Sequence, residues 1–375
     1  MNDKNERRKA ADHLFRGIMN NKKAEWWKEK GYVERYSLEE IEQALGNVFT
    51  VFDEDWLKHI LNVWVEKDGR GHYLIQELAI RGLWPLVILV EFGKDLEELR
   101  RLNKFDLLVK ELRNPSKFIA VWLESEIAAH CLRNRYSVEL YPKVRGKVPD
   151  LKISFDSEEV MVEIKEIGPG EMEVRYYEVM DFLASIVMPN IPQGISVKVT
   201  ANTMPNDSEL TRLARAIVEY LQQQTKEKVV SLKMGRLKAL IEIKEDKYTS
   251  FSLTPPEAIA LNQLKRLGRS IKHEARQIPL PYVGLVVLDA AILQGFSDEV
   301  IRDVVVKTFK KYSLPNIIAV VIVRSYKFHR LPTETEIISV PNPHQTKLEL
   351  LKTLDKIFTF SRTRNLLHDS ELPNR

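Results

Sequence analysis

Cysteine is almost absent from this sequence: Cys131 is the single cysteine among 375 residues. An intrachain disulfide is therefore excluded, and so is a zinc centre built from several cysteines. Chains without disulfides are typical of reducing compartments, so we expect a cytoplasmic protein. Glycine and proline are also scarce, with 15 and 17 residues, which excludes a collagen-like or low-complexity chain.

Long hydrophobic runs are missing as well. The longest, at 83–90 and 317–323, are far shorter than the roughly 20 residues that a membrane-spanning helix needs. The first 15 residues, MNDKNERRKAADHLF, contain no apolar stretch of the kind found in a signal peptide. We therefore expect no contact with a membrane.

Neither sign of charge dominates, because 57 lysines and arginines face 53 aspartates and glutamates. The net charge of +4 is too small to coat the surface for nucleic acid, so any such binding must use local clusters. The sequence also lacks a G-x-x-x-x-G-K-[ST] loop and an H-E-x-x-H pair, so ATP use and zinc hydrolysis are not indicated. With 44% hydrophobic residues, a folded protein of roughly two to three domains is expected.

The spacing of apolar residues divides the chain into a helical part and a mixed part. At 38–48, 56–65 and 96–112 apolar residues recur with helical spacing, which predicts a helical accessory domain over 1–115. A break at Asn114-Pro115 then precedes a helix over 116–133. We expect an α/β domain over 116–340 and a C-terminal helix and tail over 341–375.

Beyond residue 133 the apolar period changes to two, which is typical of strands. The patterns predict an α-β-β-β-α-β order, in which three strands follow the first helix and a second helix precedes a fourth strand. These elements are expected at 116–133, 137–141, 150–155, 160–166, 171–188 and 195–201. Further strands and helices are expected at 239–244, 250–253, 256–276, 283–289, 297–312 and 317–323. We expect all the strands to form one mixed sheet.

One hairpin gathers charged side chains. Turn-forming residues at 156–158 separate two strand patterns, so the chain should fold back near Ser157 and bring Asp150 beside Ile164. Because side chains alternate along a strand, Glu163 and Lys165 share one face. Two carboxylates and an ammonium group should therefore meet at one end of the hairpin.

Such a cluster suits metal-assisted hydrolysis of a phosphodiester. Mg²⁺ prefers carboxylate oxygens and retains several waters, and Mn²⁺ can take the same ligands. The metal lowers the pKa of a bound water, and a neighbouring lysine can orient or deprotonate that water. We therefore expect Mg²⁺ or Mn²⁺ as the cofactor.

The segment Pro149-Asp150, twelve residues and then Glu163-Ile164-Lys165 resembles the motif of the PD-(D/E)XK nuclease superfamily. The resemblance implies the restriction-endonuclease-like fold, whose core has the same α-β-β-β-α-β order. It also implies that Asp150 and Glu163 bind the metal and that Lys165 assists the attacking water. It leaves the branch of the superfamily open.

In that superfamily a glutamate on the first helix often completes the metal site. Two glutamates, Glu124 and Glu126, lie on the predicted helix here. Glu124 shares a helical face with Ile127 and Cys131, whereas Glu126 points about 160° away. We therefore take Glu124 as the third metal ligand.

Basic residues cluster in two places. Lys143, Arg145 and Lys147 precede the motif, and Arg266, Arg269 and Lys272 lie on one side of the predicted helix at 256–276. Lysine and arginine at such positions can contact nucleic-acid phosphates, but a solvated helix face explains the second cluster equally well. We expect nucleic acid as the partner, DNA before RNA, and the helical N-terminal region can serve a homodimer or a partner subunit.

Two functions therefore remain open: a metal-dependent nuclease, acting for example in defence or repair, and an inactive protein of the same fold that binds nucleic acid or supports assembly. A second copy of the tripeptide, Glu242-Ile243-Lys244, follows Met234-Gly-Arg-Leu-Lys with no acidic residue in the required place. We expect that copy to be structural.

Overall fold

The computed structural model describes residues 5, 8–9, 11–12, 36–66, 72, 74, 85–155, 158–223, 228–293, 295–325 and 335–344. Its contacts divide the chain into two compact units. Unit 1 comprises Met1–Ile167 with Ser270–Arg375, and unit 2 comprises Gly168–Arg269. The boundary expected near residue 115 lies inside unit 1, and most of the expected C-terminal helix and tail lies outside the described residues.

The N-terminal part of unit 1 is helical, as predicted. Its helices are α3 (Leu38–Val51), α4 (Glu54–Glu66), α6 (Pro85–Leu99), α7 (Phe105–Leu112) and α8 (Phe118–Arg133). Helix α3 begins at a capping box, in which the Ser37 hydroxyl accepts from the Glu40 N–H and the Glu40 carboxylate accepts from the Ser37 N–H. It packs against α6 so closely that a Cβ at Gly93 would collide with the carbonyl oxygen of Ala44.

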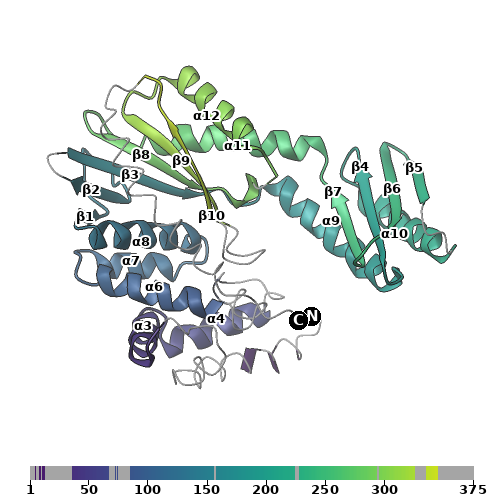
Figure 1. Cartoon of the computed structure of the whole chain (residues 1–375), viewed down its shortest axis with the longest axis horizontal. Coiled ribbons are helices and arrows are strands. Elements are labelled where there is room, and N and C mark those ends of the chain that lie inside the picture. The colour runs from purple at the N-terminus through teal and green to yellow at the C-terminus, as the bar shows by residue number, and fades with distance from the viewer. Residues whose placement is uncertain are drawn as a thin grey trace. The chain divides into compact units, whose positions relative to one another are not determined.

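A six-stranded sheet forms the centre of unit 1. In spatial order its strands are β1 (Ser137–Leu140), β2 (Leu151–Phe155), β3 (Glu158–Glu166), β8 (Val283–Asp289), β9 (Ile317–Ser325) and β10 (Thr335–Pro341). Strands β3, β8 and β9 are parallel, and the outer pairs are antiparallel. Helix α8 packs on one face, and α12 (Asp298–Tyr312) lies on the other (Figure 1). The parallel strands are apolar runs because both of their faces are buried.

Unit 2 has a sheet and a core of its own. Its elements are α9 (Glu171–Val187), a 3-10 turn η1 (Met188–Asn190), β4 (Ile195–Ala201), α10 (Asp207–Gln222), β5 (Lys228–Met234), β6 (Leu237–Glu245), β7 (Ser250–Thr254) and most of α11 (Glu257–Ala275). The strand order is β5-β6-β4-β7. Buried side chains of α9 and α10 pack on alternate residues of the strands, which makes one face of this sheet the core.

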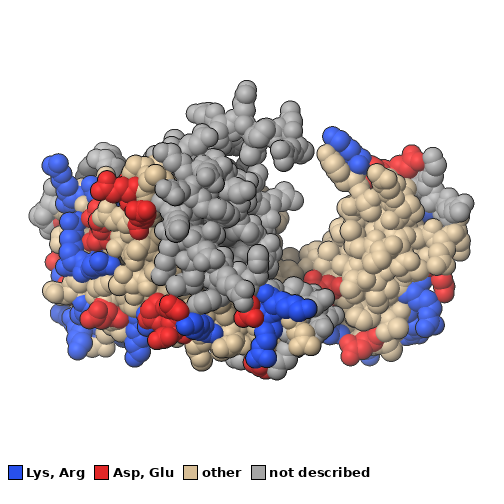
Figure 2. Space-filling view, turned by 90° about the horizontal axis from the view of Figure 1, so that it is seen from below, with Lys and Arg blue, Asp and Glu red and all other residues tan. Residues whose placement is uncertain are grey.

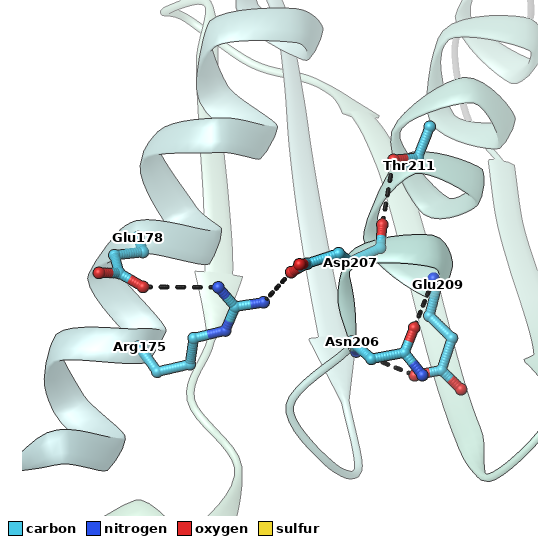
Figure 3. A network of polar contacts seen from close by, with 6 residues as sticks. All are labelled: Arg175, Glu178, Asn206, Asp207, Glu209 and Thr211. Carbon is cyan, nitrogen blue, oxygen red and sulfur yellow. Dashed lines mark hydrogen bonds and ion pairs between the residues drawn. The ribbon is translucent and has the colours of Figure 1, made fainter.

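Polar contacts join the two helices that cover this sheet (Figure 3). The Arg175 guanidinium on α9 reaches Glu178 at 3.4 Å and Asp207, the first residue of α10, at 2.5 Å. Asn206 caps α10, since its side chain accepts from the Glu209 N–H at 2.9 Å and the Glu209 carboxylate accepts from the Asn206 N–H at 3.0 Å. The negative charges of Asp207 and Glu209 also suit the positive end of the helix dipole.

The prediction of a single mixed sheet is wrong. The strand expected at 195–201 is present as β4, but it pairs with β6 and β7 in the second sheet. The strand that lies beside β3 is β8, which follows more than a hundred residues later in the chain. Alternation of apolar residues identifies a strand but not its partner, because pairing depends on long-range contacts.

The described surface mixes both charges. On the face that Figure 2 shows, basic and acidic side chains lie interspersed among uncharged residues, in keeping with the small net charge. Of the helices in the described part of the chain, none has the length and apolar character to cross a membrane.

Candidate active site

The hairpin of β2 and β3 positions the two carboxyl groups of the candidate site. Its strands pair in a register that differs by one residue from the predicted one. Leu151 pairs with Val162 and Phe155 with Glu158, so Asp150 stands opposite Glu163 instead of Ile164. The difference arises because two residues, not three, connect the strands, and two-residue connections are the commonest in hairpins. The predicted convergence of Asp150 and Glu163 survives the shift.

The carboxyl groups of Asp150 and Glu163 interact directly. Asp150 accepts a hydrogen bond from the Ile164 N–H at 2.7 Å, which fixes its carboxylate at the end of β2. Burial, and then the charge of Asp150, raise the pKa of Glu163, which is only 5% exposed. Burial also raises the pKa of Asp150, although less, because the Ile164 N–H stabilises its charged form. The two groups therefore compete for one proton, and Glu163 holds it.

Glu124 reaches the same cluster from α8. Its side chain is buried, with 2% exposure, and burial followed by the charge of Asp150 raises its pKa well above the usual value. The Oε1 atoms of Glu124 and Glu163 are both buried without a hydrogen-bond partner among the described residues. A buried polar oxygen without a partner is costly, so these atoms mark a place where a cation or a water would be favourable.

A fourth carboxyl group was not predicted. Glu274, near the end of α11, is 8% exposed, and its charge adds to burial in raising the pKa of both Asp150 and Glu163. The sequence does hold a signal for it. Leu267 and Ile271 are buried on the same helix, and Glu274 is spaced seven and three residues from them, so it interrupts an apolar stripe.

Two lysines lie on the exposed side of the cluster. Lys165 is exposed and has no ion pair within the described residues, and its charge partly offsets the burial that raises the pKa of Asp150 and Glu274. Lys147 is also exposed, and its charge similarly opposes the effect of burial on Glu163. The predicted separation of faces on β3 is confirmed, because Val162 and Ile164 lie in the core with α8.

The donor atoms of the carboxyl groups are of the kind that a hard cation prefers, but their positions do not form a coordination site. In the described part of the chain, no three histidine, cysteine, aspartate or glutamate side chains have the geometry to hold a metal ion. The donors are nonetheless all oxygens, and two of them are buried without a partner in the described structure. These residues fit Mg²⁺ or Mn²⁺ as a ligand set, provided that Glu163 loses its proton and the side chains rotate.

The predicted basic cluster before the motif forms an exposed turn. Lys143, Arg145 and Lys147 are all exposed, and Val144 and Lys147 form an isolated bridge across the turn. Gly146 occupies the left-handed region at φ 78°, which allows the tight reversal. This turn precedes Asp150 by three residues, and its last member, Lys147, is the cation whose charge acts on Glu163.

The second basic cluster, on α11, is only partly as predicted. Arg269 is exposed, but Arg266 forms an ion pair at 3.3 Å with Glu173, a nearly fully buried residue, and also donates to the Gly168 carbonyl. Lys272 lies over the Tyr312 ring at 4.5 Å. The outward projection predicted for Arg266 is therefore corrected: a buried carboxylate requires a partner, and Arg266 supplies it.

The second Glu-Ile-Lys copy lies in β6, where Glu242 stands 3.8 Å from Lys198 and 3.6 Å from Lys244. These cross-strand and same-strand ion pairs agree with the structural role expected for it.

The comparisons with known proteins add no relative. The sequence matches no protein-family model, and neither curated proteins nor solved structures give a match. Function must be argued from the geometry alone.

Proposed function

We propose that this protein is a metal-dependent nuclease that hydrolyses phosphodiester bonds, with DNA as the expected substrate. The observation that carries the proposal is the meeting of Glu124, Asp150 and Glu163 in one buried cluster beside the exposed Lys165. Burial raises the pKa of each of these carboxyl groups, and the charge of Asp150 adds to the effect at Glu124 and Glu163, as the charge of Glu274 does at Asp150. Clusters of this kind are costly for folding and concentrate at functional sites.

The order of elements around the cluster supports the proposal. Helix α8 leads into β1, β2 and β3, and α11 leads into β8, which pairs with β3 in parallel. This is the α-β-β-β-α-β order that the resemblance to the PD-(D/E)XK nucleases implies. Here the second helix and fourth strand are α11 and β8, and the elements from α9 to β7 are inserted between β3 and α11.

Each side chain has a distinct part in the proposed reaction. Asp150, held by the Ile164 N–H, supplies an oriented carboxylate. The partnerless oxygens of Glu124 and Glu163 complete the ligand set. A bound Mg²⁺ or Mn²⁺ supplies charge stabilisation at the phosphate and a water of lowered pKa. Lys165 orients that water, since its ammonium group is not held by an ion pair with any described residue.

The test is a cleavage assay on labelled duplex DNA, single-stranded DNA and RNA with Mg²⁺ or Mn²⁺. We expect cleavage by the wild-type chain, and loss of at least about 100-fold in Asp150→Ala and Glu163→Gln, because a metal ligand contributes several kcal/mol to the transition state. Glu242→Gln is the matched control, since it changes the same residue type in the same tripeptide. Cleavage that persists in Glu163→Gln, or falls equally in Glu242→Gln, would contradict the proposal.

One observation favours the alternative, an inactive nucleic-acid-binding module. The described carboxyl groups are not arranged to hold a metal, and their raised pKa values favour the neutral, protonated forms. If the alternative is correct, the protein binds DNA equally with and without Mg²⁺, and no substrate is cut. Calorimetric titration of Mg²⁺ and Mn²⁺ into the wild type and Glu163→Gln separates the two functions, because only the nuclease requires Glu163 for metal binding.

A further inference from the structure

One face of the unit 2 sheet is left open. Residues along each strand alternate, so one set packs against α9 and α10 and the other set, which we call the open face, points away from these helices. Four exposed lysines lie on the open face: Lys198 on β4, Lys233 on β5, and Lys238 and Lys244 on β6. Glu242 is the single acidic residue there, so the face carries a net charge of +3.

Most of the other open-face positions carry hydroxyl groups. Ser196 and Thr200 on β4 and Ser231 on β5 are examples, and Thr200 donates to the Thr254 hydroxyl of β7 at 3.3 Å. Hydroxyl and ammonium groups are the side-chain donors that proteins use most for nucleic-acid phosphates. The open face therefore presents hydrogen-bond donors on all four strands and positive charge on β4, β5 and β6.

Two of the lysines are placed at a cost to the fold. Lys233 and Lys238 stand directly opposite each other across β5 and β6, and both are exposed. Like charges at such positions destabilise a strand pair. The turn that joins these strands adds a third exposed cation, Arg236, beside Gly235 at φ 62°. An anionic ligand would remove this repulsion, whereas no acidic residue stands opposite either lysine.

The composition of the open face distinguishes between kinds of nucleic acid. Proteins that bind unpaired bases stack them on aromatic side chains. Among the described residues of β4 to β7 the aromatic one is Phe251, which pairs with the buried Val197 and packs towards the helices. A face with lysines, hydroxyls and two exposed aliphatic side chains, Val229 and Leu240, but no aromatic platform fits a duplex, whose bases are stacked internally and whose phosphates face outward.

We propose that the open face binds the phosphate backbone of double-stranded nucleic acid without reading its sequence. The choice of nucleic acid over another polyanion rests on the proposed nuclease function. The location of the binding site and the contacts with phosphates are inferred from the lysines and hydroxyl groups of the open face. The open face then holds the substrate, a role separate from the carboxyl cluster that cuts it.

The test measures binding of a fluorescein-labelled DNA duplex to the full-length protein by anisotropy over a range of salt concentrations. EDTA is present throughout, so no cleavage occurs. Lys233→Gln with Lys238→Gln is compared with Arg212→Gln and Arg215→Gln, two exposed cations of α10 away from the open face. Loss of two phosphate contacts should reduce the slope of log K against log salt by about 1.8 and weaken binding roughly ten- to a hundredfold, whereas the control should keep both.

Other measurements complete the design. Thermal unfolding of the Lys233→Gln, Lys238→Gln variant should be unchanged or occur at higher temperature, because a like-charge pair is removed. Equal slopes in the two double variants would overturn the proposal. So would tighter binding of the single strand than of the duplex, or competition by poly-glutamate as effective as competition by unlabelled duplex. Because binding is measured without metal, its failure is distinguishable from failure of cleavage by the carboxyl cluster.

Discussion

The same tripeptide, Glu-Ile-Lys, occupies two strands of this protein in opposite circumstances. Glu163 on β3 is 5% exposed and lies among other carboxyl groups, and Lys165 has no ion pair with a described residue. The Glu242 side chain on β6 is 23% exposed and lies between two lysines. The tripeptide therefore does not determine its chemistry. Its surroundings determine whether the glutamate is buried among other carboxyl groups or partly exposed and paired with lysines.

The two strands differ in how they are covered. Both are interior strands, but β3 lies in a sheet with buried side chains on both faces, whereas β6 has helices on one face only. Burial removes water from Glu163 and raises its pKa, whereas the Glu242 carboxylate is partly exposed and lies beside two lysines. Four predictions use this contrast.

The largest difference should appear in catalysis. Lys165→Ala should reduce Mg²⁺-dependent DNA cleavage by roughly 100- to 10,000-fold, the usual contribution of a group that orients or deprotonates the nucleophile. Lys244→Ala, its counterpart on β6 and a member of the open face, should weaken DNA binding but leave the rate at saturating DNA unchanged, because Lys244 takes no part in the chemical step. Initial rates at saturating DNA measure both. An unchanged dissociation constant for DNA beside the lower rate in Lys165→Ala would distinguish a catalytic role from a structural one.

Stability should respond with the opposite sign at the two glutamates. At pH 8 Glu163→Gln should raise the free energy of unfolding by about 1–3 kcal/mol, because the amide stays neutral and can donate to Asp150 as the protonated acid does. Glu242→Gln should instead lower it slightly or leave it unchanged. Urea denaturation gives both values. A less stable Glu163→Gln protein would contradict this prediction, and would mean that the Glu163 carboxyl group stabilises the fold.

The carboxyl cluster should also make stability depend on pH and metal. Folded Glu163, Glu124 and Asp150 have raised pKa values, so the folded state binds more protons than the unfolded one above about pH 4.5, where glutamates of the unfolded chain have lost their protons. Stability present at low pH is therefore lost as pH rises through the folded pKa values. Glu166, with a pKa raised to about 7 by burial and then by Asp289, acts in the same direction.

A divalent cation should oppose that loss. At pH 8, Mn²⁺ at ten times its dissociation constant should stabilise the fold by about 1.4 kcal/mol. The same Mn²⁺ concentration should stabilise it less at pH 6, because protons compete for the ligands. Differential scanning fluorimetry with and without Mn²⁺ measures it. The metal effect should vanish in Glu163→Gln but remain in Glu242→Gln, which separates this site from general binding to surface carboxylates.

The smallest effect is expected at the ion pairs of β6. Lys244→Ala should change the free energy of unfolding by less than about 0.5 kcal/mol, because exposed pairs are screened by water and salt. Urea denaturation at low and high salt measures the change. A loss above about 1 kcal/mol would show that the ion pairs on β6 stabilise the sheet. Charged side chains would then affect stability on β6 as well as on β3.

Much of the local structure was predictable. The helices α3, α4 and α8 and the strands β2, β3, β8 and β9 all lie where the apolar period indicated. The pairing of Asp150 with the end of β3 was predicted to within one residue, since a hairpin is a local structure. Glu274 was not predicted, because its approach to the cluster depends on the packing of a helix and Glu274 lies 109 residues after Lys165, a separation over which period and spacing carry no information.

Sequence alone determined the helical and strand segments, the hairpin and the kinds of side chain it gathers, because these depend on neighbours within a few residues. Tertiary structure alone decided that two sheets exist, that β8 and not β4 lies beside β3, and that Arg266 neutralises a buried glutamate. It also decided which glutamate of the two identical tripeptides is buried away from solvent. Burial is a property of the whole fold, and pKa follows burial.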